Sequence, residues 1–239
     1  MNKEIKIAIL DAVPKIYWKD DDGITDAEKF IDLLAPENSE ASFSTYYVAE
    51  QQFPESVDHY DAFMLTGSPA SVSDDSAWIQ RLSQLILEAN KKGKRIIGTC
   101  FAHQLIAKTF GGEVSKNKKG WMIGNYNLRI QPEINYSWME PKANDTGLYL
   151  FNEERVTRLP DSAKAFAHSD EYPNFAYTLG DNILCMQGHP EQPLRAMNNF
   201  IAATPLSEVD LAKAKLHLNN GAPDAKVWAQ WMMQFLLQI

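Results

Sequence analysis

Short β-branched runs alternate with longer amphipathic segments along the first half of the chain. Patterns of buried strands occupy residues 5–10, 44–48, 62–65 and 95–99. Helical periodicity follows in the intervening segments, over residues 25–34, 76–91 and 100–110. This alternation is typical of βαβ units, so we predict an α/β fold with a mostly parallel central sheet and helices on both faces.

The second half of the chain predicts further strands and a helical C-terminus. The strand patterns cover residues 126–130, 147–151, 163–167 and 182–186. The predicted helices cover residues 194–203, 207–218 and 223–237. An apolar stripe on the last helix indicates core packing or an interface, and it contains Val227, Trp228, Trp231, Met232, Phe235 and Leu236. We find no repeat or linker, so we expect one domain over residues 1–239, with a core at about 5–203 and a C-terminal helical extension at about 204–239.

Composition narrows the possible partners. The chain has 239 residues, 45% of them hydrophobic, and a formal net charge of -8, which argues against nucleic acid and anionic membranes as partners. No apolar stretch approaches the roughly 20 residues needed to cross a bilayer. The N-terminal segment is apolar only briefly, so it predicts a strand and not a signal peptide. With only Cys100 and Cys185, no disulfide framework is expected, and we predict a cytoplasmic protein.

Cys100 lies where a predicted strand runs into a predicted helix. Parallel sheets place their ligands at the carboxyl ends of such strands. The unpaired N–H groups and the positive end of the helix dipole favour a thiolate at this position, and the N–H of Phe101 would point toward an oxyanion. A lone cysteine is more often a small buried residue, as we expect for Cys185 within its strand.

Two further segments support chemistry at Cys100. In an extended chain, residues two apart face the same side, so Glu191 can orient the imidazole of His189. An imidazole steered by a carboxylate toward a thiolate is the arrangement of a nucleophile, a base and an orienting group. In the loop of residues 66–69, Gly67 lets the backbone approach a ligand and offer a second N–H. Taken alone, that loop is an ordinary turn.

These segments together resemble a known family. Gly-Thr-Cys-Phe-Ala-His-Gln at 98–104, Thr-Gly-Ser-Pro at 66–69 and Gln-Gly-His-Pro-Glu at 187–191 are similar, in order and spacing, to the class I glutamine amidotransferases. The resemblance covers roughly residues 5–200. It implies a flavodoxin-like three-layer fold, no cofactor and no metal. The other histidines show no spacing typical of metal ligands, and they are His59, His103, His168 and His217.

The resemblance implies roles for individual residues. Cys100 would be the nucleophile, His189 the general base and acid, and Glu191 its partner. Gly67 and Phe101 would supply the oxyanion N–H groups. Two more residues would bind the substrate, namely Ser68 and Gln104. The implied reaction is hydrolysis of a γ-glutamyl amide through a γ-glutamyl thioester on Cys100.

The sequence leaves alternatives to this reaction open. It carries neither a phosphate loop nor a synthetase-type nucleotide loop, so any ammonia acceptor would be a separate synthase subunit served by this chain as a glutaminase. We favour a stand-alone hydrolase, since the extra C-terminal helices predict a finished surface. The stand-alone members that the chain resembles include γ-glutamyl peptidases. A non-catalytic, redox-sensing or regulatory relative is the third possibility.

Two positions depart from the family pattern. Ala102 stands where the family usually has glycine, and residues 152–160 lack a histidine that is frequent there. The acidic side chains nearby could bind a substrate ammonium, but solvated surface charge is the simpler expectation, and they are Glu153, Glu154, Asp170 and Glu171.

Overall fold

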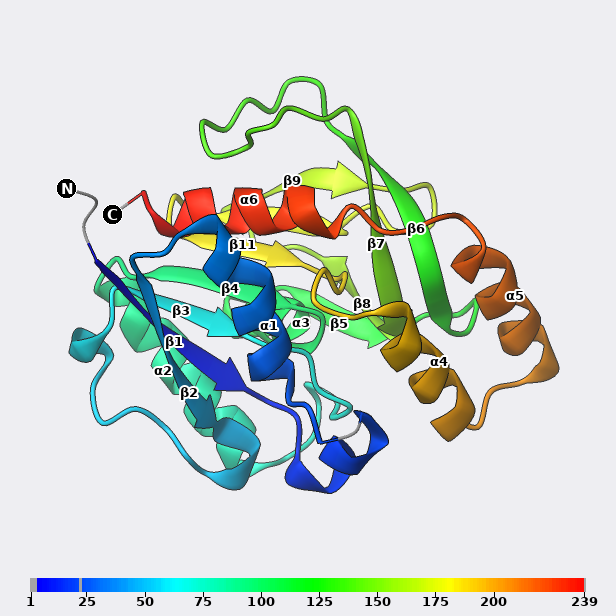
Figure 1. Ribbon diagram of the computed structural model, residues 1–239, viewed down its shortest axis with the longest axis horizontal. Coiled ribbons are helices and arrows are strands. Elements are labelled where there is room, and N and C mark those ends of the chain that lie inside the picture. Colours follow the sequence, from blue (N-terminus) through cyan, green and yellow to red (C-terminus); the bar gives the residue numbers. More distant parts are fainter. Residues whose placement is uncertain (1–3, 22, 239) are drawn as a thin grey trace.

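A computed structural model describes residues 4–21 and 23–238 (Figure 1). The α-helices are α1 (Asp26–Leu34), α2 (Ala77–Lys91), α3 (Phe101–Thr109), α4 (Leu194–Ala203), α5 (Glu208–Leu218) and α6 (Ala225–Leu236). The strands are β1 (Ile5–Asp11), β2 (Ala41–Tyr47), β3 (Ala62–Leu65), β4 (Arg95–Thr99), β5 (Glu113–Lys116), β6 (Met122–Ile130), β7 (Asp145–Asn152), β8 (Glu154–Arg158), β9 (Ala163–His168), β10 (Ala176–Leu179) and β11 (Ile183–Met186). Short 3-10 helices are η1 (Lys15–Asp21), η2 (Ala35–Glu37), η3 (Val48–Glu50) and η4 (Val57–His59).

A nine-stranded sheet forms the centre of the fold, in the order β2-β1-β3-β4-β11-β10-β9-β6-β7. The first five strands in this order pair in parallel. The remaining pairs are antiparallel, from β11 and β10 to β6 and β7. The carboxyl ends of β3, β4 and β11 therefore meet at one edge of the sheet. The segments that follow these strands contain Gly67, Cys100 and His189, respectively.

Two apolar cores cover the two faces of this sheet. Along β1, Ile7 and Ile9 face a core shared with α1 and α6, whereas Ala8 and Leu10 face a core shared with α2 and α3. This is the alternation that a strand buried on both faces requires. Trp228 and Trp231 of α6 are fully buried in the first core, so the apolar stripe of the last helix packs on the sheet within this chain.

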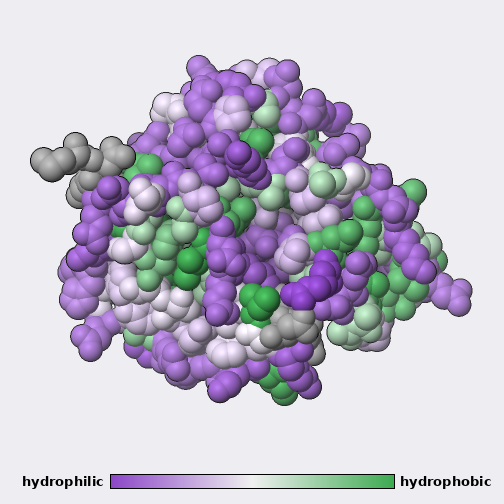
Figure 2. Space-filling view, in the orientation of Figure 1, coloured by the Kyte–Doolittle hydropathy of each residue, from purple (hydrophilic) through white to green (hydrophobic). Residues whose placement is uncertain are grey.

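Helices α4 and α5 lie beside β6 and β7, the last two strands in the order of the sheet (Figure 1). A third, smaller apolar cluster joins them to these strands through Ile123, Tyr149, Met197 and Ala214. The surface seen in Figure 2 is mostly hydrophilic, with hydrophobic side chains gathered over α4 and α5. Leu194, Val209 and Leu216 of these two helices are exposed.

The predicted α/β architecture is confirmed, including the helices on both faces and the extra C-terminal helices. Thr25 caps α1 in a capping box with Glu28. Three strands were not predicted, namely β5, β8 and β10, and β2 begins three residues before its predicted start. Within the described parts of the chain, no helix combines the length and apolarity needed to span a bilayer.

Candidate active site

Cys100 stands at the turn between β4 and α3. Its backbone has φ 50° and ψ -106°, a conformation that side-chain-bearing residues rarely adopt, and it occupies the N-cap of α3. The N–H of Cys100 donates to Met186 O of the neighbouring strand at 2.9 Å. The strained turn lifts the cysteine above the sheet edge, and the side chain is only 6% exposed.

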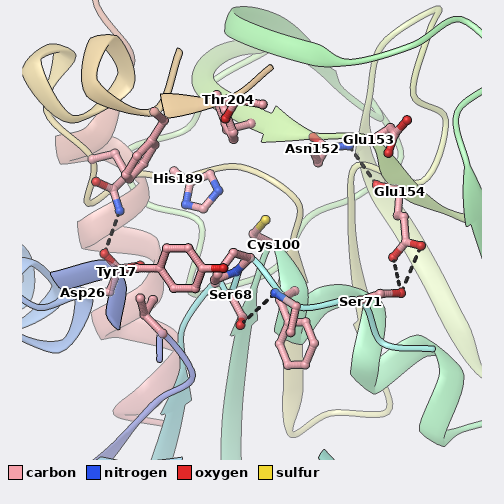
Figure 3. Close-up of a pocket in the computed structure, with 18 of the residues that line it drawn as sticks. Tyr17, Asp26, Ser68, Ser71, Cys100, Asn152, Glu153, Glu154, His189 and Thr204 are labelled. Carbon is pink, nitrogen blue, oxygen red and sulfur yellow. Dashed lines mark hydrogen bonds between the residues drawn. The ribbon is translucent and has the colours of Figure 1, made fainter. Parts of the chain in front are cut away.

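The imidazole of His189 comes from the chain that follows β11. Its backbone N–H donates to Tyr149 O at 2.8 Å, in an isolated bridge that fixes the segment against β7. Nδ1 of His189 lies 2.7 Å from Oε1 of Glu191, and both side chains are buried. Figure 3 shows the ring of His189 beside the sulfur of Cys100. The spatial relation that the sequence predicts among these three side chains is present.

Gly67 closes the same corner from β3. A Cβ placed on Gly67 would lie 3.0 Å from Cε1 of His189 and 3.5 Å from Cβ of Cys100. The buried Thr66 holds this loop, since its hydroxyl accepts from Ala12 N at 2.9 Å and donates to Gly67 O at 3.0 Å. The three segments that carry the family motifs therefore meet at one corner, with no room for a side chain on Gly67.

Two residues from different elements that adjoin the cysteine carry backbone N–H groups. One is Gly67, and the other is Phe101 at the start of α3. Among residues 4–21 and 23–238, neither N–H has a protein acceptor, so both are available to a bound oxyanion. Ser68 lines the same cavity, and its hydroxyl accepts from Ala70 N at 3.2 Å.

Two glutamine side chains lie behind the sulfur. The amide nitrogen of Gln187 donates to Sγ of Cys100 at 3.4 Å, and its Oε1 accepts from Gln104 at 3.0 Å and from the hydroxyl of Tyr172 at 2.8 Å. Gln104 also donates to Glu154 O at 2.9 Å while lining the cavity. Gln187 was missed as a site residue, although its spacing of two from His189 places both on the same side of an extended chain.

A buried polar network continues from the carboxylate of Glu191. The amide of Gln192 donates to Oε1 of Glu191 at 3.2 Å and to Oδ1 of Asp26 at 2.9 Å. Lys29 donates to the same Asp26 oxygen at 2.7 Å and to Oε1 of Gln192 at 3.0 Å. These residues were not predicted, because Asp26 and Lys29 look like the polar face of an amphipathic helix. No local signal pairs them with a segment that lies about 160 residues later in the chain.

Burial and neighbouring charges set the protonation of this region. Burial alone would lower the pKa of His189, but the charges of Cys100 and Glu191 outweigh it and raise that pKa well above its ordinary value. Burial raises the pKa of Asp11 to about 6, with a further contribution from the charge of Asp26. Burial also raises the pKa of Cys185 to about 12, so this second thiol stays protonated. The raised pKa of His189 lets its imidazole hold a proton inside the buried site.

A cavity of about 510 Å³ opens in front of Cys100. In Figure 3 the sulfur lies between His189 and Tyr17 on one side and Glu154 and Ser71 on the other. The cavity is lined by all four residues that the sequence predicted to bind the oxyanion or the substrate, namely Gly67, Ser68, Phe101 and Gln104.

The acidic side chains expected at the surface divide into two groups. Glu153 and Glu154 line the cavity, where Glu154 accepts from the hydroxyl of Ser71 at 2.9 Å and Glu153 pairs with Lys116 at 2.9 Å. Asp170 pairs with Arg129 at the surface. In the described ranges, no group of three or more histidine, cysteine and carboxylate side chains is arranged to hold a metal ion.

Comparison with known proteins agrees with this geometry. The family model for glutamine amidotransferase class-I matches residues 27–207. Gamma-glutamyl peptidase 4 of Arabidopsis thaliana is 30% identical over 218 residues, which span 87% of this chain and 85% of that protein. The glutamine-hydrolyzing GMP synthase of Chlorobium phaeobacteroides is 25% identical over 68% of this chain but only 32% of its own length. A crystal structure of a glutamine amidotransferase from Thermotoga maritima shares the fold, with a TM-score of 0.76, 18% identity, and coverage of 99% of this chain and 100% of that one. The chain therefore belongs to the class-I glutamine amidotransferase family and is an enzyme of that type.

Proposed function

We propose that this enzyme hydrolyses γ-glutamyl amides through a thioester on Cys100. The observation that carries the proposal is the buried series of Glu191, His189 and Cys100, with 2.7 Å between the carboxylate and Nδ1 of the imidazole. The carboxylate holds the ring with Nδ1 bonded, so Nε2 is the nitrogen left to exchange a proton at the sulfur.

In the first half of the reaction, the sulfur of Cys100 attacks the γ-carbonyl carbon after its proton has passed to His189. The carbonyl oxygen becomes an oxyanion, which the N–H groups of Gly67 and Phe101 stabilise. The carbon–nitrogen bond then breaks, the amine nitrogen takes the proton from His189, and the γ-glutamyl group remains on the sulfur as a thioester.

In the second half, water takes the place of the departed amine. His189 removes a proton from this water as the oxygen attacks the thioester carbon. The carbon–sulfur bond breaks and the sulfur leaves as a thiolate beside the protonated imidazole, so glutamate is released and the starting enzyme is restored. The raised pKa of His189 supports this cycle, because the protonated imidazole balances the thiolate in the resting state.

The glutamyl end of the substrate would lie against the polar side of the cavity. Gln104 and Ser68 line this side and would contact the glutamyl chain. Glu154 offers a carboxylate to the α-ammonium, and Lys116 offers a cation to the α-carboxylate. This set of charges matches the two ends of an α-amino acid.

The comparisons favour a stand-alone hydrolase over a glutaminase subunit. The plant γ-glutamyl peptidase aligns over most of both chains, whereas the GMP synthase aligns over about a third of its length. A synthase partner that receives ammonia is the alternative, and it predicts little turnover by the isolated chain.

The purified protein alone tests these two possibilities. We expect it to release ammonia or amine from a panel of γ-glutamyl amides, including free glutamine and γ-glutamyl-methylamide. Cys100→Ser should remove this activity. Cys185→Ser is the matched control, because Cys185 is buried in β11 away from the cavity and should retain full activity.

Three outcomes would contradict the proposal. Turnover that survives Cys100→Ser would exclude the thioester, and a lack of turnover on every amide would exclude the hydrolase. Activity that emerges only with an added synthase subunit would favour the glutaminase alternative.

A further inference from the structure

Cys100 lies between two cavity walls of different chemistry (Figure 3). On one side, the labelled side chains include Ser71, Asn152, Glu153 and Glu154, which are all polar or charged. On the other side lie His189, the ring of Tyr17 and the carboxylate of Asp26. The two walls must therefore contact different parts of any substrate that reacts at the sulfur.

The chemistry of amide cleavage decides which part lies on which side. The imidazole delivers its proton to the amine nitrogen as the carbon–nitrogen bond breaks, so the leaving amine must lie on the side of His189. The glutamyl chain extends from the same carbonyl carbon in the other direction. The wall beyond His189 is thus the wall that faces the leaving amine.

Four apolar or aromatic side chains line the cavity on this side, beside the polar groups described below, and we call these four the amine wall. They are Val13, Tyr17, Ile24 and Phe200. Tyr17 belongs to η1 and Phe200 to α4, and these two elements contact each other. Tyr17 is 47% exposed and Ile24 is 39% exposed, so both present apolar surface that a ligand can still cover.

The charged groups on this side already balance one another. Asp26 and Lys29 line the cavity there and form a buried ion pair at 2.7 Å. Both also bond to Gln192, which ties them to Glu191. A leaving amine that carried a charge would meet apolar side chains and a neutralised pair, whereas an apolar amine would bury its surface against the amine wall.

Size points in the same direction. Ammonia, the leaving group of free glutamine, is too small to touch the amine wall. The cavity of about 510 Å³ is in the range of pockets that enclose whole small molecules. We infer that the preferred substrates are γ-glutamyl amides of apolar alkyl or aromatic amines, selected by the amine wall. This inference rests on the proposed function and names its substrate class.

The test compares amides that share one acyl group. γ-Glutamyl-isopentylamide, γ-glutamyl-methylamide, γ-glutamyl-glycine and free glutamine all form the same thioester, so differences in kcat/KM arise from the leaving amine. The two alkyl amines have similar basicity, which removes leaving-group chemistry from their comparison. We expect kcat/KM for the isopentylamide to exceed that for the methylamide at least about tenfold, and we expect γ-glutamyl-glycine to react more slowly than the isopentylamide.

Substitutions at two adjacent positions test whether Tyr17 contacts the leaving amine. Tyr17→Ala should reduce the ratio of kcat/KM for isopentylamide to that for methylamide by roughly tenfold, because it removes apolar contact area from the larger amine alone. Ile16→Ala is the matched control. Ile16 is 69% exposed and does not line the cavity, so its substitution should keep the ratio of the unaltered enzyme.

The outcomes separate the inference from the function on which it rests. Equal kcat/KM for all the amides, or an unchanged ratio in Tyr17→Ala, would overturn the amine wall while γ-glutamyl hydrolysis stands. A preference for γ-glutamyl-glycine over the isopentylamide would overturn it as well. Failure to cleave any amide would refute the hydrolase and the inference together.

Discussion

Adding one methyl group at Gly67 should disable the site without unfolding the protein. The new Cβ of Gly67→Ala would lie 3.0 Å from Cε1 of His189, whereas carbon atoms in contact ordinarily lie about 3.5–4.0 Å apart. The ring must therefore move by roughly 0.5 Å or more, and its bond to Glu191 at 2.7 Å resists that movement. Catalytic groups work within roughly 0.5 Å of their productive positions, and a displacement of about 1 Å costs about a hundredfold. We expect kcat/KM to fall on the order of tenfold to a hundredfold.

Gly93→Ala provides the opposite control. Gly93 follows α2 with φ 67°, and a Cβ there would meet no atom within 4 Å. Its substitution should destabilise the fold by about 1–2 kcal/mol through the left-handed conformation and leave kcat/KM unchanged. The assay measures initial rates on γ-glutamyl-methylamide and thermal unfolding for both variants. Full activity in Gly67→Ala with normal stability would show that His189 and Gly67 do not lie together during turnover.

Three further predictions concern buried groups around the site. Gln192→Leu removes hydrogen bonds to two buried carboxylates, so we expect the free energy of unfolding to fall by roughly 3 kcal/mol. We also expect an altered pH profile of kcat, because Glu191 is held less firmly, and an unchanged profile would mean that Gln192 is only structural. Burial lowers the pKa of His103 to about 3, below its ordinary value in the unfolded chain, so the free energy of unfolding should decrease as the pH falls below about 6.5. Between pH 7.5 and pH 5.5, the unaltered protein should lose about 1.4 kcal/mol more of this free energy than His103→Phe. Equal losses in the two proteins would contradict burial of a neutral ring. An uncharged alkylating reagent should modify Cys100 and spare Cys185 in the folded protein, because burial keeps the thiol of Cys185 protonated. Peptide mapping would locate the modified cysteine, and modification of both cysteines at similar rates would contradict the burial of Cys185.

Much of the fold could be predicted from the sequence wherever one periodicity dominated. β3 and β4 match their predicted bounds, because runs such as Ala62–Leu65 are apolar on both faces and are bounded by turn residues. α4 also matches its predicted bounds. The strand β10 was missed, since the run Ala176–Leu179 contains Tyr177 and Thr178 and is not a continuous apolar run like that of β3. Its pairing with β9 and β11 makes it a strand.

The reactive centre was predictable because its geometry is largely local. The turn that holds a cysteine between a strand and a helix is determined by a few consecutive residues. The same is true of a carboxylate that lies two residues from a histidine in an extended segment. The walls of the cavity were not predictable. Tyr17, Lys116 and Phe200 come from η1, β5 and α4, and their meeting depends on how distant elements pack.

The central claim is that the γ-glutamyl group passes through a bond to Cys100. The most direct measurement is the intact mass of enzyme quenched in acid during turnover of a γ-glutamyl amide, followed by peptide mapping. We predict a mass increase equal to one glutamyl acyl group, located on the peptide that contains Cys100, and its absence from Cys100→Ala. Rapid release of amine by enzyme that never gains this mass, or by Cys100→Ala, would contradict the account.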